Sequence, residues 1–358
     1  MDLARAMAIS LVLFAHFVYK WTNVGFWGVE LFFALSGFLI GQILWRNYAA
    51  SERWNFENIK NFWSRRWWRT LPNYYLFFLV MIAFHYSMGN QLPTPWGFAK
   101  VLVFSQDLVS SNYKFFGVAW SLCIEEWFYL LFPLVLFVFS LVTPIKKRAF
   151  ILTLISFVVF STIMRFLLKG HNEMNSLREI TFARLDAIGF GVASSFWLSG
   201  KKVSLSTKKI SFVAGALLLT ASLACIFIFK LDFTYIFNSQ LFFFITPGSF
   251  ALMLPLLSLL KAPAGVFSIF STFIGKMSNW AYSIYLCHVP VMFLVYKMFG
   301  NIRDNPGWNI ISKLAGIAVT LIISSLIYKY FELPFTNKRP KELRPGIPAG
   351  NVSAVTRA

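Results

Sequence analysis

Long apolar runs recur along the whole chain, separated by short polar stretches. A helix rises 1.5 Å per residue, so about 20 apolar residues cross the hydrocarbon core of a bilayer. The sequence predicts spanning helices over ten runs: 3–20, 24–45, 71–88, 118–142, 149–168, 184–199, 210–229, 240–260, 280–299 and 308–331. We therefore expect an all-α, polytopic membrane helix bundle that forms one domain over residues 1–337.

The basic residues in the loops predict the orientation of this bundle. Cytoplasmic loops are enriched in Lys and Arg. With the N-terminus inside, the inside loops hold Arg46, Arg53, Lys60, Arg65, Arg66 and Arg69, then Lys146, Lys147 and Arg148, then Lys201, Lys202, Lys208 and Lys209, then Lys261 and Lys276. A shorter run at 97–109 would turn every later basic loop outward if it spanned, so we interpret it as interfacial or re-entrant on the outer side. Both termini are then cytoplasmic, and residues 338–358 form a basic, disordered tail.

The composition fits this class and excludes others. Hydrophobic residues make up 58% of the chain and charged residues 13%, against roughly 45–50% apolar residues in soluble domains. The net charge of +19 falls in the loops, so it reflects orientation rather than nucleic-acid binding. Cys123, Cys225 and Cys287 lie in apolar runs at no metal-ligand spacing, so we expect neither a disulfide framework nor a metal site. The first run begins almost at Met1, so we expect no cleavable signal peptide.

Ionisable residues inside the spans are candidates for function, because charges in lipid are costly. His16 follows Arg5 by eleven residues, close to three helical turns, so the two share a face with His16 about 16 Å farther outward. Glu30 and Glu125 enter their spans near the same level. A histidine and a carboxylate at one depth suit a base with an orienting acid. The alternative for His16 is a structural role. For Glu30 it is a packing hydrogen bond, since the small residues Ala34, Gly37 and Gly41 follow at helical spacing.

Arg66 and Arg69 stand three residues apart just before the third span, in a stretch rich in Trp and Arg. Two interpretations are open. Such a stretch anchors a helix at the lipid headgroups, but arginine also presents a forked donor that suits phosphate. The second interpretation predicts a cytoplasmic site for an anionic phosphate compound.

A further group of polar residues is expected to contact substrate. Its members are Glu126 on the fourth span, Arg184 and Asp186 at the start of the sixth, and Tyr285 and His288 on the ninth. Arg184 and Asp186 also suit a pair with each other. For His85 and His171 we prefer a structural role. Cations at the inner face and a histidine with carboxylates farther out would suit a cytosolic anionic donor that reaches an outward-facing base, and equally a proton-coupled transporter.

Seven motifs in order resemble acyltransferase family 3, the integral-membrane O-acyltransferases that modify carbohydrates. The motifs are Arg5 with His16, then Gly28–Ile40, then Arg66 with Arg69, then Trp120–Leu130, then Arg184–Asp186 with Gly189 and Gly191, then Tyr282–Leu286 with His288, and Tyr330–Phe335. Two departures are that the chain starts unusually close to the first motif and that Trp127 stands where Gln is common in the family. The extra esterase-like domain of some members is not in this sequence.

The resemblance implies that acetyl-CoA is the donor and that a hydroxyl of an outward-facing glycan is the acceptor. The acceptor could be a surface polysaccharide, a lipopolysaccharide, a peptidoglycan, a lipo-oligosaccharide, a lipid-linked glycan or a small glycosylated metabolite. We expect the modification to take place at a bacterial cytoplasmic membrane. Arg66, Arg69 and Arg5 would hold the CoA phosphates. His16 would act as general base or transient acyl carrier, with Glu125 or Glu30 orienting it, and Ser36 is a weaker nucleophile candidate. The alternative is a transporter or flippase of an acyl or glycan lipid, which explains the helices and the buried charges but not the order of the motifs.

Overall fold

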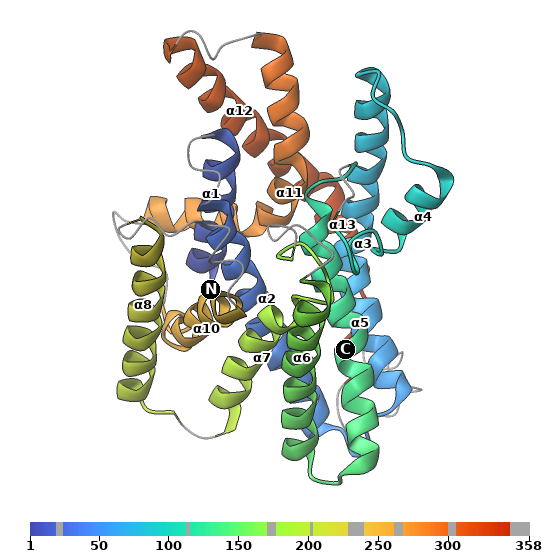
Figure 1. The fold of residues 1–358 in the computed structure, drawn as a ribbon, viewed down its shortest axis with the longest axis vertical. Coiled ribbons are helices and arrows are strands. Elements are labelled where there is room, and N and C mark those ends of the chain that lie inside the picture. The colour runs from blue at the N-terminus through green and yellow to red at the C-terminus, as the bar shows by residue number, and fades with distance from the viewer. Residues whose placement is uncertain are drawn as a thin grey trace, which may run out of the picture.

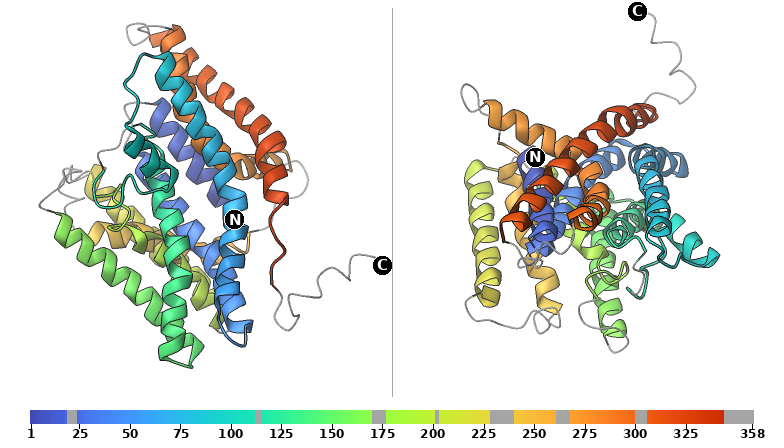
Figure 2. Two further views of the ribbon diagram at one scale, coloured as in Figure 1. Left: turned by 90° about the vertical axis from the view of Figure 1, so that its right-hand side faces the viewer. Right: turned by 90° about the horizontal axis from the view of Figure 1, so that it is seen from above.

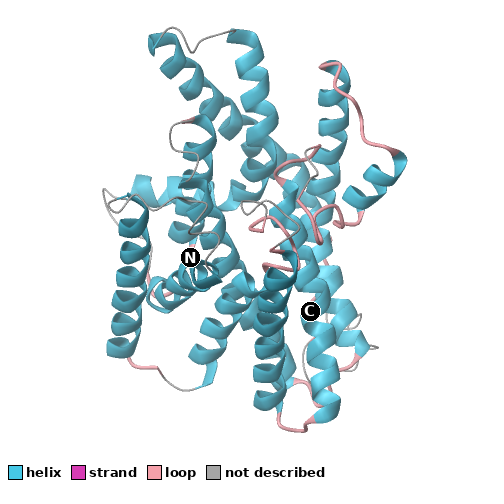
Figure 3. Cartoon of the chain, in the orientation of Figure 1, coloured by secondary structure: helices cyan, strands magenta, loops and turns pink. Residues whose placement is uncertain are grey.

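A computed structural model describes residues 1–18, 24–111, 115–169, 177–200, 203–227, 240–260, 268–299 and 306–343. Over these ranges the chain consists of helices and loops, without a strand (Figure 3). The all-α class predicted from the sequence is therefore confirmed. His171, Lys201, Lys202, Lys261 and the tail beyond residue 343 lie outside the described residues.

A helix covers each of the ten apolar runs. The helices are α1 (Asp2–Phe17), α2 (Val24–Ala50), α3 (Phe56–Ser87), α5 (Ala119–Val142), α6 (Lys146–Leu168), α7 (Leu185–Gly200), α8 (Leu205–Phe227), α10 (Gln240–Leu257), α11 (Ser268–Phe299) and α12 (Pro306–Ile327). In the described part of the chain, six helices are long and apolar enough to cross a membrane: α2, α5, α6, α8, α10 and the helical stretch that begins in α12. The full count of ten spans stays a prediction, because α1 and α7 are only 16 residues long and α3 and α11 contain polar stretches.

The short run after the third span forms only α4 (Pro95–Leu102). Its N-cap is Thr94, whose side chain accepts from the Gly97 N–H at 3.2 Å, and Pro95 fits the first turn because its missing N–H needs no partner there. Eight residues of helix cover only about 12 Å, so α4 does not cross a bilayer. This agrees with the interpretation of 97–109 as a segment that does not span.

Helix ends gather at two opposite ends of the molecule, and which of the two faces the cytoplasm stays a prediction. In Figure 1 the C-terminal ends of α2, α5 and α7 lie at the lower end of the molecule, whereas those of α1, α3 and α11 lie at the upper end. Helix α8 lies at the edge of the bundle, against α10 (Figure 2). The C-terminal segment continues past α12 through a π-helical turn (Tyr328–Glu332) and α13 (Leu333–Asn337).

Residues 338–343 lie along the start of α3. Arg65 donates to the Pro340 carbonyl oxygen at 2.6 Å and Asn61 to that of Lys341 at 3.1 Å. Glu342 pairs with Arg46 of α2 at 2.5 Å. This part of the tail therefore has specific contacts.

The tightest packing joins α2 and α7 through glycines. A Cβ on Gly37 would lie 2.0 Å from the Ile188 carbonyl oxygen, and one on Gly191 would lie 2.0 Å from the Ala34 carbonyl oxygen. Small residues let helix backbones approach this closely. The close contact predicted from Ala34, Gly37 and Gly41 is confirmed, and its partner is α7.

Two buried ion pairs hold α7 to its neighbours. Arg184, just before α7, pairs with Glu30 of α2. Arg165 of α6 pairs with Asp186 of α7 at 2.8 Å, and all four side chains are at most 2% exposed. Arg165 also donates to the Gln240 side chain and to the Ala183 carbonyl oxygen, each at 2.7 Å. One prediction was that Arg184 and Asp186 pair with each other. They do not, because each is paired with an opposite charge on another helix.

The glycine contact yields a matched test within one helix. Gly191→Ala forces a methyl group against backbone, so we expect the free energy of unfolding to fall by about 1–3 kcal/mol or more. Gly189→Ala lies two residues away, where an added Cβ meets nothing within 4 Å, and we expect it to be neutral or stabilising by up to about 1 kcal/mol. Thermal unfolding of both variants in detergent measures the difference, and equal midpoints would contradict the close contact.

The buried pair of α6 and α7 yields a second prediction. Arg165→Met leaves Asp186 buried without its cation, which costs about 3–5 kcal/mol of stability. Adding Asp186→Leu removes the orphaned charge and should recover part of the loss. The control is Arg46→Met, which breaks a pair whose side chains are 62% and 29% exposed and should cost about 1 kcal/mol or less. Unfolding in the same detergent compares the three, and an unchanged midpoint for Arg165→Met would contradict the structure.

Candidate active site

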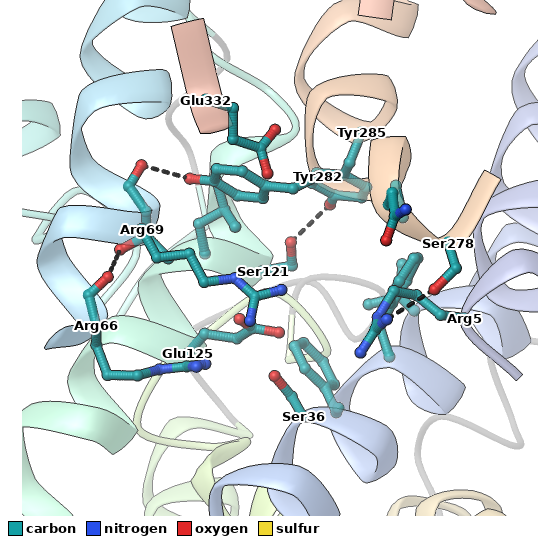
Figure 4. Close-up of a pocket in the computed structure, with 17 residues that line it drawn as sticks. Arg5, Ser36, Arg66, Arg69, Ser121, Glu125, Ser278, Tyr282, Tyr285 and Glu332 are labelled. Carbon is teal, nitrogen blue, oxygen red and sulfur yellow. Dashed lines mark hydrogen bonds between the residues drawn. The ribbon is translucent and has the colours of Figure 1, made fainter. Parts of the chain in front are cut away.

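One cavity collects the cations that the sequence singled out. It has an empty volume of about 760 Å³ and receives Arg5 from α1, Arg66 and Arg69 from α3 and Glu125 from α5. Figure 4 shows the three guanidinium groups directed into the same space, with Glu125 and Ser36 at its lower side. We call it the arginine cavity. The structure therefore brings together the three residues predicted to bind the donor.

The arginines are held by local contacts. Arg5 donates to the Ser278 hydroxyl at 2.7 Å, and Asp2 lies 3.5 Å from it. The guanidinium of Arg66 lies 4.5 Å from the centre of the Tyr129 ring. Arg66 and Arg69 share one face of α3, because residues three apart on a helix are neighbours. Three cations and the carboxylates of Glu125 and Glu332 line the cavity, which leaves an excess of positive charge.

Glu125 belongs to the arginine cavity and not to His16. Its carboxylate accepts from the Tyr129 hydroxyl at 3.1 Å, and that hydroxyl lies 2.6 Å from Ser36 Oγ. Glu30 is turned toward Arg184. The structure therefore does not bring either predicted orienting acid to His16, because each carboxylate is bound elsewhere.

A second cavity contains His16, and we call it the histidine cavity. Its empty volume is about 1360 Å³, and its polar lining includes His85, Arg178 and Glu179. His16 Nδ1 lies 2.9 Å from the Val12 carbonyl oxygen. A carbonyl only accepts, so Nδ1 carries the proton and Nε2 of the neutral ring keeps a lone pair. The backbone of α1 thus fixes the tautomer that a general base requires.

His288 packs against His16 and lines neither cavity. The two rings meet edge to face with centroids 4.6 Å apart. His288 Nδ1 lies 2.7 Å from the Tyr285 carbonyl oxygen, and His288 is fully buried. In this structure His288 packs against the ring of His16, and its contact with substrate stays a prediction.

Tyr285 and Val29 line both cavities and form their common wall. The Tyr285 hydroxyl lies 2.6 Å from Ser121 Oγ and donates to the Val118 carbonyl oxygen at 3.0 Å. These contacts hold the ring across the space between Arg66 and His16. Tyr285, expected to touch substrate, lies at the boundary between the two cavities.

The other predicted substrate residues lie away from both cavities. Glu126 lines a separate cavity of about 540 Å³ beside Tyr75 and Trp127. Arg184 and Asp186 are completely buried in ion pairs. The helical positions of Glu125 and Glu126, adjacent in sequence, point in different directions, so only one of them can face the arginine cavity.

Three residues that line the cavities received no role in the sequence analysis, although one of them, Glu332, lies in the Tyr330–Phe335 motif. Glu332 accepts from the Ser283 hydroxyl at 2.5 Å and from the Asn73 amide at 3.2 Å, and the π-helical turn carries it into the arginine cavity. The sequence indicated Glu332 through its position, as an acidic residue at the end of the last apolar run. Arg178 and Glu179 lie in a loop, where sequence spacing gives no direction. His85, predicted to be structural, is bound by the Phe115 carbonyl oxygen at 3.0 Å.

Within the described ranges, no three His, Cys, Asp or Glu side chains gather as metal ligands. The three cysteines are free. The polar groups that line the two cavities are guanidinium, carboxylate, hydroxyl, amide and imidazole groups.

Comparison with known proteins adds independent evidence. The profile of the family described as "Acyltransferase domain" matches residues 1–329. The chain is 26% identical to "Putative O-acetyltransferase SACOL0978" of Staphylococcus aureus strain COL, over 96% of this chain and 58% of that protein. It is 27% identical to "Putative peptidoglycan O-acetyltransferase YrhL" of Bacillus subtilis (93% and 54%) and to "O-acetyltransferase OatA" of S. aureus (94% and 57%). No solved structure matches.

The chain spans a little over half the length of these relatives. The match covers the residues of both cavities up to the π-helical turn, and six apolar helices agree with an integral membrane protein. The motifs, the helices and the profile match together show that this chain is a member of acyltransferase family 3.

Proposed function

We propose that this protein transfers an acetyl group from cytosolic acetyl-CoA to a hydroxyl of a carbohydrate on the other side of a bacterial cytoplasmic membrane. One observation carries the proposal: a cavity with three arginines and a cavity with a histidine share the wall formed by Tyr285 and Val29. Such an arrangement suits a donor that enters from one side and an acceptor that enters from the other.

The arginine cavity suits the donor. Coenzyme A carries its phosphates at one end and its thioester at the end of a narrow, uncharged arm. Guanidinium groups bind phosphate oxygens through forked, charge-assisted hydrogen bonds. In the proposal Arg5, Arg66 and Arg69 hold the phosphates, and the arm extends along Tyr285 toward the histidine cavity. Glu125 binds the Tyr129 hydroxyl and limits repulsion among the cations.

The histidine cavity suits the acceptor and the chemistry. His16 Nε2 takes the proton of the acceptor hydroxyl while that oxygen attacks the thioester carbonyl. The new C–O bond forms, the C–S bond breaks, and the proton on His16 passes to the departing CoA thiolate. The Val12 carbonyl and the ring of His288 hold the imidazole through these steps. Transient acetylation of His16 is the alternative route.

The names of the relatives support this class of acceptor. They are described as O-acetyltransferases, one of them of peptidoglycan, which is a glycan outside the cytoplasmic membrane.

The role of His16 is tested with the purified protein. His16→Ala removes the base, so we expect acetyl transfer to fall by about 10²–10⁴-fold while acetyl-CoA still binds. His85→Ala is the matched control, because both ring nitrogens of His85 contact neighbours. In this variant the rate of acetyl transfer should fall by less than tenfold. Transfer of labelled acetyl to a glycan acceptor measures both, and full activity of His16→Ala would end this assignment.

The role of the arginines is tested separately. Arg69→Ala removes a charge-assisted contact worth about 1.5–3 kcal/mol, so the KM for acetyl-CoA should rise by roughly 10–100-fold. Arg65→Ala is the control, since Arg65 binds the Pro340 carbonyl oxygen and does not line the cavity. An unchanged KM in Arg69→Ala would favour the lipid-anchor interpretation of this stretch.

A further inference from the structure

The histidine cavity contains a cation that forms no ion pair within the described part of the chain, and this points to the chemistry of the acceptor. Arg178 lines the cavity together with His16. Among the described residues no carboxylate lies within ion-pair distance of Arg178, and its buried Nε has no hydrogen-bond partner there. Arg178 is half-buried, and holding a guanidinium partly out of water without an ion pair is costly.

The position of Arg178 is fixed by aromatic rings. Its guanidinium lies 5.3 Å from the centre of the Trp120 ring and 5.6 Å from that of Phe26. Cation–π contacts of this kind hold an arginine in place and leave its in-plane N–H groups free to donate. Trp120 also lines the cavity, so Arg178 and the Trp120 ring that it contacts belong to the same cavity wall.

Two carboxylates, those of Glu179 and Glu30, interact with Arg178 electrostatically, but neither forms an ion pair with it. Arg184, the nearest arginine along the chain, already takes the carboxylate of Glu30. Glu179 lines the cavity but is not within pairing distance of Arg178, and burial raises the pKa of its carboxyl, which weakens it as a counterion. Arg178 thus remains the available cation of this cavity.

We propose that Arg178 binds an anionic group, a carboxylate or a phosphate, on the carbohydrate acceptor and thereby places a hydroxyl beside His16. This rests on the proposed function and narrows its acceptor to anionic carbohydrates. Arg178 is close enough to His16 to interact with it electrostatically. A bound anion cancels that positive charge, so the imidazole can accept the hydroxyl proton without a second cation facing it.

The test starts from the product. Glycans from cells that express the wild type or His16→Ala are compared by mass spectrometry, and the glycan acetylated only by the wild type is purified and deacetylated with mild base. If neither strain gains an acetyl group, the proposed function fails. If both strains gain it, the role of His16 fails, and with it the placement of a hydroxyl beside His16 by Arg178. If the acceptor is found but carries neither carboxylate nor phosphate, only the assignment of Arg178 fails.

The second step measures the charge contact directly. The purified acceptor is compared with the same glycan after amidation of its carboxyl groups and after phosphatase treatment, which distinguishes the two anions. For the wild type, the KM for the charge-free form should be at least tenfold higher. In Arg178→Gln the KM for the charged acceptor should rise at least tenfold and the preference should vanish, whereas Arg178→Lys should keep part of it.

The controls separate binding from folding. Arg178→Gln should keep the wild-type KM for acetyl-CoA, because Arg178 does not line the arginine cavity. Arg65→Gln, which changes an arginine outside both cavities, should keep the preference for the charged acceptor. Equal KM values of the wild type for the charged and the charge-free acceptor would overturn the proposal, and so would an intact preference in Arg178→Gln. If Arg178→Gln folds poorly, Arg178→Lys decides: a preference that is reduced but still present supports the proposal, and a preference as large as that of the wild type contradicts it.

Discussion

The approach of α2 to α7 is the contact on which the two cavities depend. Gly37 and Gly191 let the two backbones meet, and the pair of Glu30 with Arg184 locks them at one height. The other faces of α2 carry Val29, in the wall between the cavities, and Ser36, in the arginine cavity. Any shift of α2 against α7 would therefore move a wall of both sites at once. The close packing of α2 on α7 therefore also fixes the geometry of the two cavities.

Much of the fold could be predicted from the sequence, because the membrane limits what the chain can do. A span must be apolar, helical and about 20 residues long, so the ten runs locate ten helices. The small residues after Glu30 predicted close packing, and the structure adds the partner helix. The sequence could not supply the direction of each polar side chain. Glu125 and Glu126 are neighbours in the chain, yet they line different cavities.

The sequence predicted which residues belong to the site better than it predicted which partners they bind. Arg5, Arg66 and Arg69 meet in one cavity as expected, since helix spacing places them on inward faces. Arg184 and Asp186 were expected near substrate, but they pair with Glu30 and Arg165 instead. A buried charged residue can be present for a structural ion pair or for function, because a buried charge is costly without a partner. Sequence spacing alone does not distinguish these two cases. Arg178 was missed because it lies in a loop, whose course depends on tertiary contacts.

The partner of His16 has a consequence for genetics. Its Nδ1 bonds to the main-chain carbonyl of Val12, an atom that no side-chain replacement removes. A systematic alanine scan would recover the imidazole but no acidic residue that orients it. If such a scan finds no acidic residue that acts with His16, the reason is that a main-chain carbonyl, and not a side chain, orients the imidazole.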